Sequence, residues 1–286
     1  MMAPRKRTLL FIPALAEKFL GKAHERGANA IIVDLEDSIP AAQKQHARAA
    51  LSGAVASLQQ RRLPVWVRVN NVADLLDDDL AAAAAAGVEG VLIPKVERPA
   101  EVDALDATLA ALERRHGRNE DSLRLALTIE SPSGALAAAS LPAPPRLAAL
   151  AFGAEDFAAA LAVPPTPAGM RGPAQMVALA ALAQGREAWG LAGSVANHTR
   201  LAQYRRAVLL SRALGFTGVL CIHPDQVAVV AAAFAPSEDE IAWARDVVER
   251  YDEARTRGSG SITVRGQMVD EPVYARAREL LLRHRA

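Results

Sequence analysis

The sequence predicts an α/β fold, a (β/α)8 barrel of the TIM type followed by a C-terminal helical segment. Eight short apolar runs recur along the chain, segments with helical periodicity lie between them, and glycine follows several of these segments. Strands that alternate with helices pair in parallel through right-handed crossovers, and eight such repeats close a barrel. A chain of 286 residues, 51% of them hydrophobic, is long enough to form one barrel domain.

The apolar runs are the predicted strands. An apolar run bounded by Arg or Pro before it and by Gly, Ser or Pro after it is typical of a strand buried on both faces. In chain order the runs are Thr8–Pro13, Ala30–Leu35, Val65–Val69, Gly90–Val96, Leu123–Ile129, Leu147–Gly153, Ala188–Gly193 and Gly218–His223.

Helical periodicity fills most of the intervals between these runs. The predicted helices are Glu17–Arg26, Gln43–Leu58, Asp77–Ala86, Ala100–Arg115 and Leu201–Leu214, and the glycines that end such helices are Gly27, Gly87, Gly185 and Gly215. The proline-rich stretch 164–173 predicts a loop on the catalytic rim, with a helix following over 174–183.

The chain changes character after the eighth run. We expect residues 1–225 to form the barrel and residues 226–286 a helical segment that serves as a lid or an oligomerisation element. Two helices are predicted over 224–235 and 236–255, the second with a capping box formed by Ser237 and Glu240. A short hairpin over 262–269 and a last helix from about 272 to 284 complete the segment.

Composition excludes several classes of protein. Lys and Arg number 33 against 32 Asp and Glu, and aromatic residues make up 4%, so no nucleic-acid partner is expected. The single cysteine, Cys221, excludes an internal disulfide and fits a reducing compartment. No run approaches the ~20 apolar residues that span a bilayer. Arg5-Lys6-Arg7 followed by an apolar stretch imitates a signal peptide, but Pro13 and the helical pattern that follows favour a first barrel strand in a cytoplasmic protein.

Two predicted strands end in acid, at the face where barrels of this type carry their active sites. The fifth run leads directly into Glu130, and the sixth leads into Glu155 and Asp156. Carboxylates from neighbouring strands would converge, which suits a hard divalent cation bound through oxygen. The other strands deliver polar residues to the same rim: Asp34, Glu36, Asp37, Arg68, Asn70, Lys95, Ser194, Asn197 and His223. Such a rim suits an anionic substrate held partly through a metal ion.

Several of these residues have a purely structural alternative. Asp34 and Lys95 could form a buried ion pair or cap loop amides, and Asp37 could cap the next helix. His223 has no neighbour at metal-ligand spacing and is expected to be a satisfied loop histidine. Cys221 lies in the middle of a strand, where inert packing is expected, because a nucleophile needs an exposed, electropositive setting.

A set of short motifs spans nearly the whole chain and resembles one known family. The chain is similar to the citrate lyase β-subunit-like branch of the HpcH/HpaI aldolase family. The matching stretches are Leu9–Pro13, Ala30–Asp37, Val67–Asn70, Leu92–Lys95, Thr128–Ser131, Phe152–Asp156, Gly215–Gly218, Ile222–Gln226 and Gly266–Asp270. The resemblance implies a modified (β/α)8 barrel in a homotrimer, whose C-terminal segment lies over a neighbouring subunit's active site. It also implies a Mg2+-dependent reaction that makes or breaks a carbon–carbon bond beside an acyl-thioester enolate.

The same resemblance implies roles for particular residues. Glu130 and Asp156 match the family's metal ligands, and Arg68 matches the arginine that contacts the 2-oxo acid or the developing enolate oxygen. Asp270 matches an aspartate that acts as acid or base in the adjacent subunit's site. Glu36 and Asp37 match the acidic pair around the metal ion. Further substrate contacts are expected from Lys18, Gly153 and Ala154.

The chain departs from the family pattern at two loops. An arginine is usual after the first strand, whereas here Lys18 and Lys22 are the nearest cations, so Arg5 or Arg7 could contact the CoA phosphates instead. After the seventh strand Asn197-His198 stands where an Asp-Phe pair is common.

The leading hypothesis is a Mg2+-dependent lyase that acts on a malyl-CoA, citramalyl-CoA or related thioester, with acyl-CoA and a 2-oxo acid as its small-molecule partners. The alternatives are a citrate lyase β subunit that acts on a citryl-acyl carrier protein, and a barrel that has lost catalysis and serves in binding or assembly.

Overall fold

The computed structural model describes residues 6–285, with side chains described as far as residue 282. The described chain forms two compact units, residues 6–232 and residues 233–285. The predicted assignment of residues 226–286 to a lid or oligomerisation segment stays a prediction. The helix Pro224–Phe234 spans the predicted boundary at 225/226.

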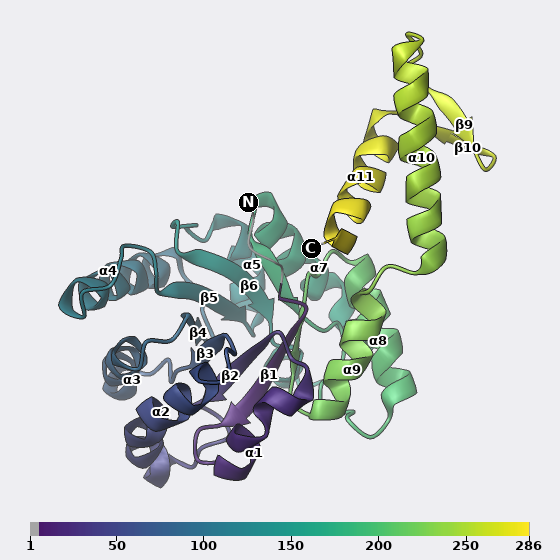
Figure 1. Cartoon of the computed structure of the whole chain (residues 1–286). Helices are drawn as coiled ribbons and strands as arrows, with labels where there is room; N and C mark the ends of the chain where they lie inside the picture. The colour runs from purple at the N-terminus through teal and green to yellow at the C-terminus, as the bar shows by residue number, and fades with distance from the viewer. Residues whose placement is uncertain (1–5, 286) are drawn as a thin grey trace. The chain divides into compact units, whose positions relative to one another are not determined.

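The first unit is a (β/α)8 barrel of the TIM type, which confirms the predicted fold class. Eight strands pair in parallel in the order β7-β6-β5-β4-β3-β2-β1-β8 (Figure 1). Their bounds are β1 Thr8–Pro13, β2 Ala30–Asp34, β3 Val65–Arg68, β4 Gly90–Ile93, β5 Arg124–Ile129, β6 Leu147–Phe152, β7 Glu187–Gly190 and β8 Val219–Cys221. All eight coincide with predicted runs to within a few residues at each end.

An isolated β-bridge closes the ring between β7 and the start of β8. Trp189 of β7 forms an isolated parallel bridge to Gly218, and the Gly190 amide donates to the Gly218 carbonyl at 3.0 Å. A Cβ atom on Gly218 would lie 2.1 Å from the Lys6 carbonyl oxygen, so only glycine fits where β8 meets β1.

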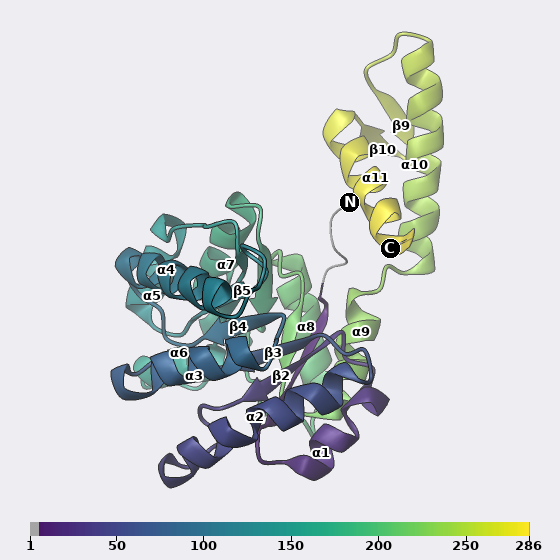
Figure 2. The same cartoon turned by 60° about the vertical axis from the view of Figure 1, so that its left-hand side comes forward.

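Helices lie outside the strands, as Figures 1 and 2 show for α2, α3 and α4. The α-helices that begin in this unit are α1 Glu17–Gly21, α2 Lys44–Gln59, α3 Ala73–Ala85, α4 Pro99–Arg115, α5 Pro132–Ala137, α6 Ala154–Ala160, α7 Pro167–Ala183, α8 Leu201–Ala213 and α9 Pro224–Phe234. Short 3-10 turns occupy Ala23–Arg26, Ala41–Gln43 and Ala138–Ser140. The four predicted helix-ending glycines all have positive φ, between 67° and 104°.

The sequence predicted a loop over residues 164–173, and this prediction was wrong for residues 167–173, which are helical. Helix α7 begins at Pro167, seven residues earlier than predicted. Thr166 caps it by accepting a hydrogen bond from the Gly169 amide at 3.2 Å. Proline is favoured in the first turn, where its missing N–H has no helical partner. The second proline, Pro173, lies inside the helix. The short helices α5 and α6 were not predicted.

The barrel interior is filled by side chains at alternate positions of the strands. Ile32, Trp66 and Ala126 belong to the central cluster of fully buried residues. The rings of Trp66 and Trp189 meet edge to face with centroids 5.2 Å apart. Because side chains alternate along a strand, residues two positions after Ile32 and Trp66 face the same interior. Those residues are Asp34 and Arg68.

The second unit has its own small core. It contains α10 Glu238–Thr256, the antiparallel strands β9 Ile262–Val264 and β10 Gln267–Val269, and α11 Glu271–Arg285. The predicted capping box of α10 is confirmed: Ser237 Oγ accepts from the Glu240 amide at 3.1 Å, and Glu240 accepts from the Ser237 amide at 2.8 Å. Stacked rings of Tyr251 and Tyr274 join α10 to α11. No helix within residues 6–285 has the length and apolar character needed to cross a membrane.

Candidate active site

Asp34 and Arg68 form a two-point ion pair at the ends of β2 and β3. The strand register places them directly opposite each other. Arg68 Nε donates to Asp34 Oδ1 and Arg68 Nη2 donates to Asp34 Oδ2, each at 2.7 Å. Burial alone would raise the pKa of Asp34, but the hydrogen bonds and charge of Arg68 outweigh burial and hold it below its ordinary value. Paired charge-assisted hydrogen bonds of this kind fix the guanidinium plane.

The other edge of the Arg68 guanidinium faces two further acids. Its Nη1 atom lies 2.9 Å from Glu36 Oε2 and 3.2 Å from Asp37 Oδ2. Burial opposes the charge on Arg68, but the three carboxylates around it keep its pKa above the ordinary value. Nη2 carries two hydrogens, and its described contact with Asp34 uses one. The second has no hydrogen-bond partner among the described contacts of Arg68.

Glu130 follows β5 and is buried with 7% of its surface exposed. Its Oε2 atom accepts a hydrogen bond from the Lys95 amide at 3.0 Å. Burial first, and then the charges of Asp156 and Glu36, raise the pKa of Glu130 to about 8. A carboxyl group in this state is costly to ionise unless a cation is supplied beside it.

Gly153 gives Glu130 the space it occupies. A Cβ atom at residue 153 would lie 2.5 Å from both Cγ and Oε1 of Glu130. The Gly153 amide donates to the Ile129 carbonyl at 3.0 Å, which holds the two backbones together. Any larger residue at 153 must therefore displace the carboxylate. The predicted substrate contacts of Gly153 and Ala154 stay predictions.

The sequence placed Glu155 and Asp156 at the end of β6, but they lie in the first turn of α6, which starts at Ala154. On a helix, adjacent residues point in different directions. Asp156 acts electrostatically on Glu130 and on Lys95, so it belongs to the acidic cluster. Glu155 instead accepts from Ser194 Oγ at 2.6 Å and from the Ala196 amide at 3.3 Å. Only Asp156 of this pair joins Glu130.

Lys95 pairs with Glu36, so the alternative of an Asp34–Lys95 ion pair was wrong. Lys95 Nζ lies 2.8 Å from Glu36 Oε1 and 3.9 Å from Asp37 Oδ1. The loop-amide alternative for Asp34 is correct, because its oxygens accept from the Glu36 amide at 3.0 Å and the Ser38 amide at 3.3 Å. Burial opposes the charge on Lys95, yet Glu36 keeps the pKa of Lys95 above its ordinary value.

This cluster has the composition of a divalent-cation site. Its carboxyl groups outnumber its cations by three; they come from Asp34, Glu36, Asp37, Glu130 and Asp156, against Arg68 and Lys95. The buried Oε2 atom of Glu36 has the ion pair with Arg68 and no hydrogen bond in addition. Within residues 6–285 no three His, Cys, Asp or Glu side chains are grouped closely enough to hold a metal by themselves. Glu130 and Asp156 fit Mg2+, which is usually held by one or two carboxylates together with water and substrate oxygens.

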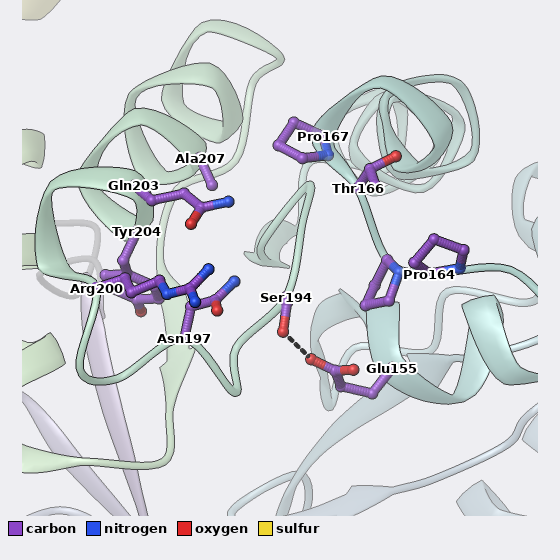
Figure 3. A pocket seen from close by; sticks show the side chains of 11 residues that line it. Glu155, Pro164, Thr166, Pro167, Ser194, Asn197, Arg200, Gln203, Tyr204 and Ala207 are labelled. Atoms are coloured by element: carbon purple, nitrogen blue, oxygen red, sulfur yellow. Dashed lines mark hydrogen bonds between the residues drawn. The ribbon is translucent and has the colours of Figure 1, made fainter.

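A separate cavity of about 350 Å³ lies on the far side of Glu155. Figure 3 shows Glu155 hydrogen-bonded to Ser194 on one side of it, with Asn197 and Arg200 on the other. The loop that carries Pro164 and Pro165 forms another wall. The lining does not include Glu130, Asp156 or Arg68, so the cavity is distinct from the acidic cluster.

The remaining predicted residues lie elsewhere in the fold. Lys18 is exposed on α1, and Arg5 lies outside the described residues. Asp270 lies in the second unit, where its Oδ1 atom accepts from the Val273 amide at 3.4 Å and so caps α11. His223 accepts from the Asp225 amide at 3.2 Å, as expected of a loop histidine. Cys221 is buried, and burial raises the pKa of its thiol to about 12.

Sequence reasoning missed the residues that hold the rim in place. Asp79 is buried and accepts from both the amide and the side chain of Asn70, at 3.0 and 2.7 Å. Arg48 donates to Asp79 from α2 at 2.7 Å. Asp79 is the last member of an Asp77–Asp79 run. Such a run is usually a solvated helix face, so no signal in the sequence marked Asp79 as buried.

Comparisons with known proteins agree with this eight-stranded parallel barrel and its acidic, arginine-containing rim. The HpcH/HpaI aldolase/citrate lyase family profile matches residues 7–224. Citrate lyase subunit beta from Leuconostoc mesenteroides subsp. cremoris is 30% identical over 282 residues, covering 96% of this chain and 92% of that protein. L-malyl-CoA/beta-methylmalyl-CoA lyase from Cereibacter sphaeroides (strain ATCC 17029 / ATH 2.4.9) is 32% identical over 289 residues, covering 90% and 86%.

A solved structure extends the similarity to the whole fold. It is that of protein CitE from Mycobacterium tuberculosis in complex with magnesium, acetoacetate and coenzyme A. It is 29% identical, covers 99% of each chain and superposes with a TM-score of 0.74. The chain belongs to the HpcH/HpaI aldolase/citrate lyase family. Its membership identifies it as a carbon–carbon lyase.

Proposed function

We propose that this protein is a Mg2+-dependent lyase that cleaves a β-hydroxyacyl-CoA thioester, such as malyl-CoA or citramalyl-CoA, to a 2-oxo acid and an acyl-CoA, or forms the thioester from these two compounds. The observation that carries the proposal is the acidic cluster in which Glu130 and Asp156 interact beside the fixed Arg68 guanidinium. The similarity to a malyl-CoA lyase and to a protein crystallised with magnesium and coenzyme A supports it.

Glu130 and Asp156 would hold the metal ion. When bound, Mg2+ supplies Lewis-acid stabilisation of the carboxylate and carbonyl oxygens of the 2-oxo acid. Ionised Glu130 and Asp156 would then face a cation, which would offset both the burial and the repulsion from Asp156 that raise the pKa of Glu130. Gly153 keeps the Glu130 carboxylate in place.

Arg68 would stabilise the negative charge that develops on substrate oxygen. In cleavage, a general base takes the proton of the β-hydroxyl group, and the carbon that carries this group becomes the carbonyl of the 2-oxo acid. The electron pair of the broken carbon–carbon bond passes to the thioester as an enolate. A guanidinium fixed by Asp34 before the reaction needs little reorganisation to meet this charge. Arginine also stays protonated throughout.

Asp270 would donate the proton that converts the enolate to the acyl-CoA product, or remove it in the condensation direction. We propose that it acts in the active site of a neighbouring copy within a homotrimer. Its side chain caps α11 at the end of the β9–β10 hairpin, so its position within the second unit is well defined. Lys18, exposed on α1, would contact the CoA portion of the substrate.

A panel of hydroxyacyl-CoA thioesters, assayed with Mg2+ and with EDTA, tests the proposal. The expected result is Mg2+-dependent release of a 2-oxo acid together with an acyl-CoA, and no free CoA. Release of free CoA without carbon–carbon cleavage would identify a thioester hydrolase instead. Asp156→Ala should abolish the Mg2+-dependent reaction, because half of the carboxylate pair is lost. Unchanged turnover in Asp156→Ala would refute the metal assignment.

Asp103→Ala is the matched control for the Asp156 substitution. Asp103 is an exposed aspartate on α4 and lies outside the acidic cluster. Its replacement should leave both Mg2+ affinity and turnover unchanged. The comparison separates a specific effect of Asp156 from the general effect of removing one negative charge.

A second candidate function is that of a citrate lyase β subunit acting on a citryl-acyl carrier protein. The similarity to citrate lyase subunit beta over 96% of the chain favours it. This candidate predicts stable co-purification with two partner subunits and turnover of the carrier-bound thioester in preference to the CoA thioester. The lyase acting on free CoA thioesters predicts turnover by the isolated chain.

A further inference from the structure

Lys95 forms hydrogen bonds with two acids of the cluster through two different parts of the residue. Its backbone amide donates to Glu130 Oε2 at 3.0 Å, while its Nζ atom donates to Glu36 Oε1 at 2.8 Å. Glu36 comes from the loop after β2, whereas Glu130 follows β5. Lys95 therefore links the group of residues around Arg68 to the predicted metal ligands.

The backbone of Lys95 adopts an uncommon conformation that serves this link. Its φ angle is +57°, in the left-handed region that side chains other than glycine seldom occupy. After this turn the Val96 amide bonds to the Thr128 carbonyl at 3.2 Å, so the chain resumes its pairing with β5. The turn leaves the Lys95 amide to bond to Glu130 instead. Strained residues of this kind are concentrated at functional sites.

Glu36 is held between two cations. Its buried Oε2 atom forms an ion pair with Arg68 Nη1 at 2.9 Å and makes no hydrogen bond in addition. Glu36 is also close enough to Glu130 to contribute to the raised pKa of that group. Among the described contacts, Lys95 Nζ supplies the hydrogen bond to the Glu36 carboxylate, on Oε1, while Arg68 forms the ion pair with Oε2.

We propose that Lys95 is a positioning residue whose ammonium group keeps Glu36 from coordinating the metal ion. The inference rests on the proposed function, in which Glu130 and Asp156 bind Mg2+. A third carboxylate on the six-coordinate ion would occupy one of the positions that Glu130 and Asp156 leave to water and to the oxygens of the 2-oxo acid. Lys95 thus keeps that position open to substrate by holding Glu36 through its Oε1 atom.

A double-mutant cycle on metal affinity tests this role without an activity measurement. Mn2+ is the probe, and its dissociation constant is measured by electron paramagnetic resonance for the wild type, Lys95→Met, Glu36→Gln and the double variant. Lys95→Met should tighten Mn2+ binding, because Glu36 becomes a ligand and a positive charge is lost. Glu36→Gln should weaken binding less than about threefold when Lys95 is present and more than about tenfold in the Lys95→Met background.

The same cycle separates positioning from simple charge. If Lys95 acts only through its charge, Glu36→Gln weakens Mn2+ binding by the same factor in both backgrounds, and the proposal is overturned. If Lys95 serves only the fold, Lys95→Met weakens Mn2+ binding, which also overturns it. Wild-type protein that binds neither Mn2+ nor Mg2+ would instead refute the proposed function itself.

A conservative variant and a kinetic readout complete the test. Lys95→Arg keeps a cation beside Glu36 and should retain Mn2+ affinity within about twofold of wild type. On an active thioester substrate, Lys95→Met should raise KM more than it lowers kcat, because the open coordination position is lost before substrate binds. A fall in kcat at unchanged KM would contradict this account.

Discussion

The carboxylate of Asp34 and the guanidinium of Arg68 meet across the β2–β3 register with two hydrogen bonds of 2.7 Å each. Both side chains are largely buried, with 3% and 15% exposed. Each charge needs its partner, because burying an unpaired carboxylate or guanidinium would carry a large desolvation penalty. The pair therefore links the stability of the barrel to the orientation of its arginine.

Asp34→Asn should lower the free energy of unfolding by about 1.5–3 kcal/mol, because a charged hydrogen-bond acceptor is removed from a buried arginine. Urea denaturation measures the change. Asp78→Asn is the matched control: Asp78 accepts a 2.8 Å hydrogen bond from Arg48, but its side chain is 69% exposed. The exposed pair should contribute less than about 1 kcal/mol. Equal losses in the two variants would show that burial does not strengthen the Asp34 contact.

Gly153→Ala should weaken Mg2+ binding at least about tenfold with little loss of stability, since the new Cβ displaces the Glu130 carboxylate rather than the backbone. Calorimetry measures the affinity, and thermal unfolding in EDTA measures the stability. Gly172→Ala serves as control, because a Cβ at residue 172 of α7 meets nothing within 4 Å. Normal Mg2+ affinity in Gly153→Ala would mean that Glu130 tolerates the displacement.

The stability of the metal-free protein should fall as pH rises from about 5 to 8. The pKa of Glu130 is raised from its ordinary value of 4.5 to about 8, so in this window the folded protein holds a proton that the unfolded chain has released. Stability decreases with pH wherever the folded state binds more protons. Glu130→Gln cannot titrate, so its stability should fall less steeply over the same range. Urea unfolding in EDTA at several pH values measures both slopes, and parallel slopes would exclude Glu130 as the titrating group.

Cys221 should resist thiol reagents until the barrel opens. The thiol is buried within 4.0 Å of the Tyr204 hydroxyl, and burial raises its pKa to about 12, which leaves almost no thiolate at neutral pH. Labelling by an aromatic disulfide should follow the rate of unfolding in urea. Ser259→Cys, at an exposed position in the second unit, should be labelled at once and confirms that the reagent is active. Rapid labelling of Cys221 in native buffer would contradict the buried position.

The strands were predictable because each is a continuous apolar run, as Ala30–Asp34 and Leu147–Phe152 illustrate. The helices were less so. Helix α7 begins at Pro167 and also contains Pro173, and local sequence rules treat a second proline as evidence for a loop. Short helices such as α5, with six residues, depend on packing and leave no periodic signal.

Residue types at the site were predictable, but their pairing was not. The sequence placed Asp34, Arg68 and Lys95 on one rim; the strand register decides that Arg68, and not Lys95, faces Asp34. Helix geometry likewise turns Glu155 toward Ser194 while Asp156 stays with Glu130. Neither choice is encoded in composition or spacing, because each depends on contacts between segments far apart in the chain.

Closure at Gly218 has a consequence for the order in which the barrel can form. β1 pairs with β2 on one side and, through three residues, with β8 on the other. A chain synthesised from its N-terminus therefore leaves one edge of its first strand without a neighbour until more than two hundred further residues have emerged. That edge carries unpaired amides and carbonyls, which can form hydrogen bonds with an incorrect strand or with another chain. Pairing of β8 with β1 both closes the barrel and covers this exposed edge.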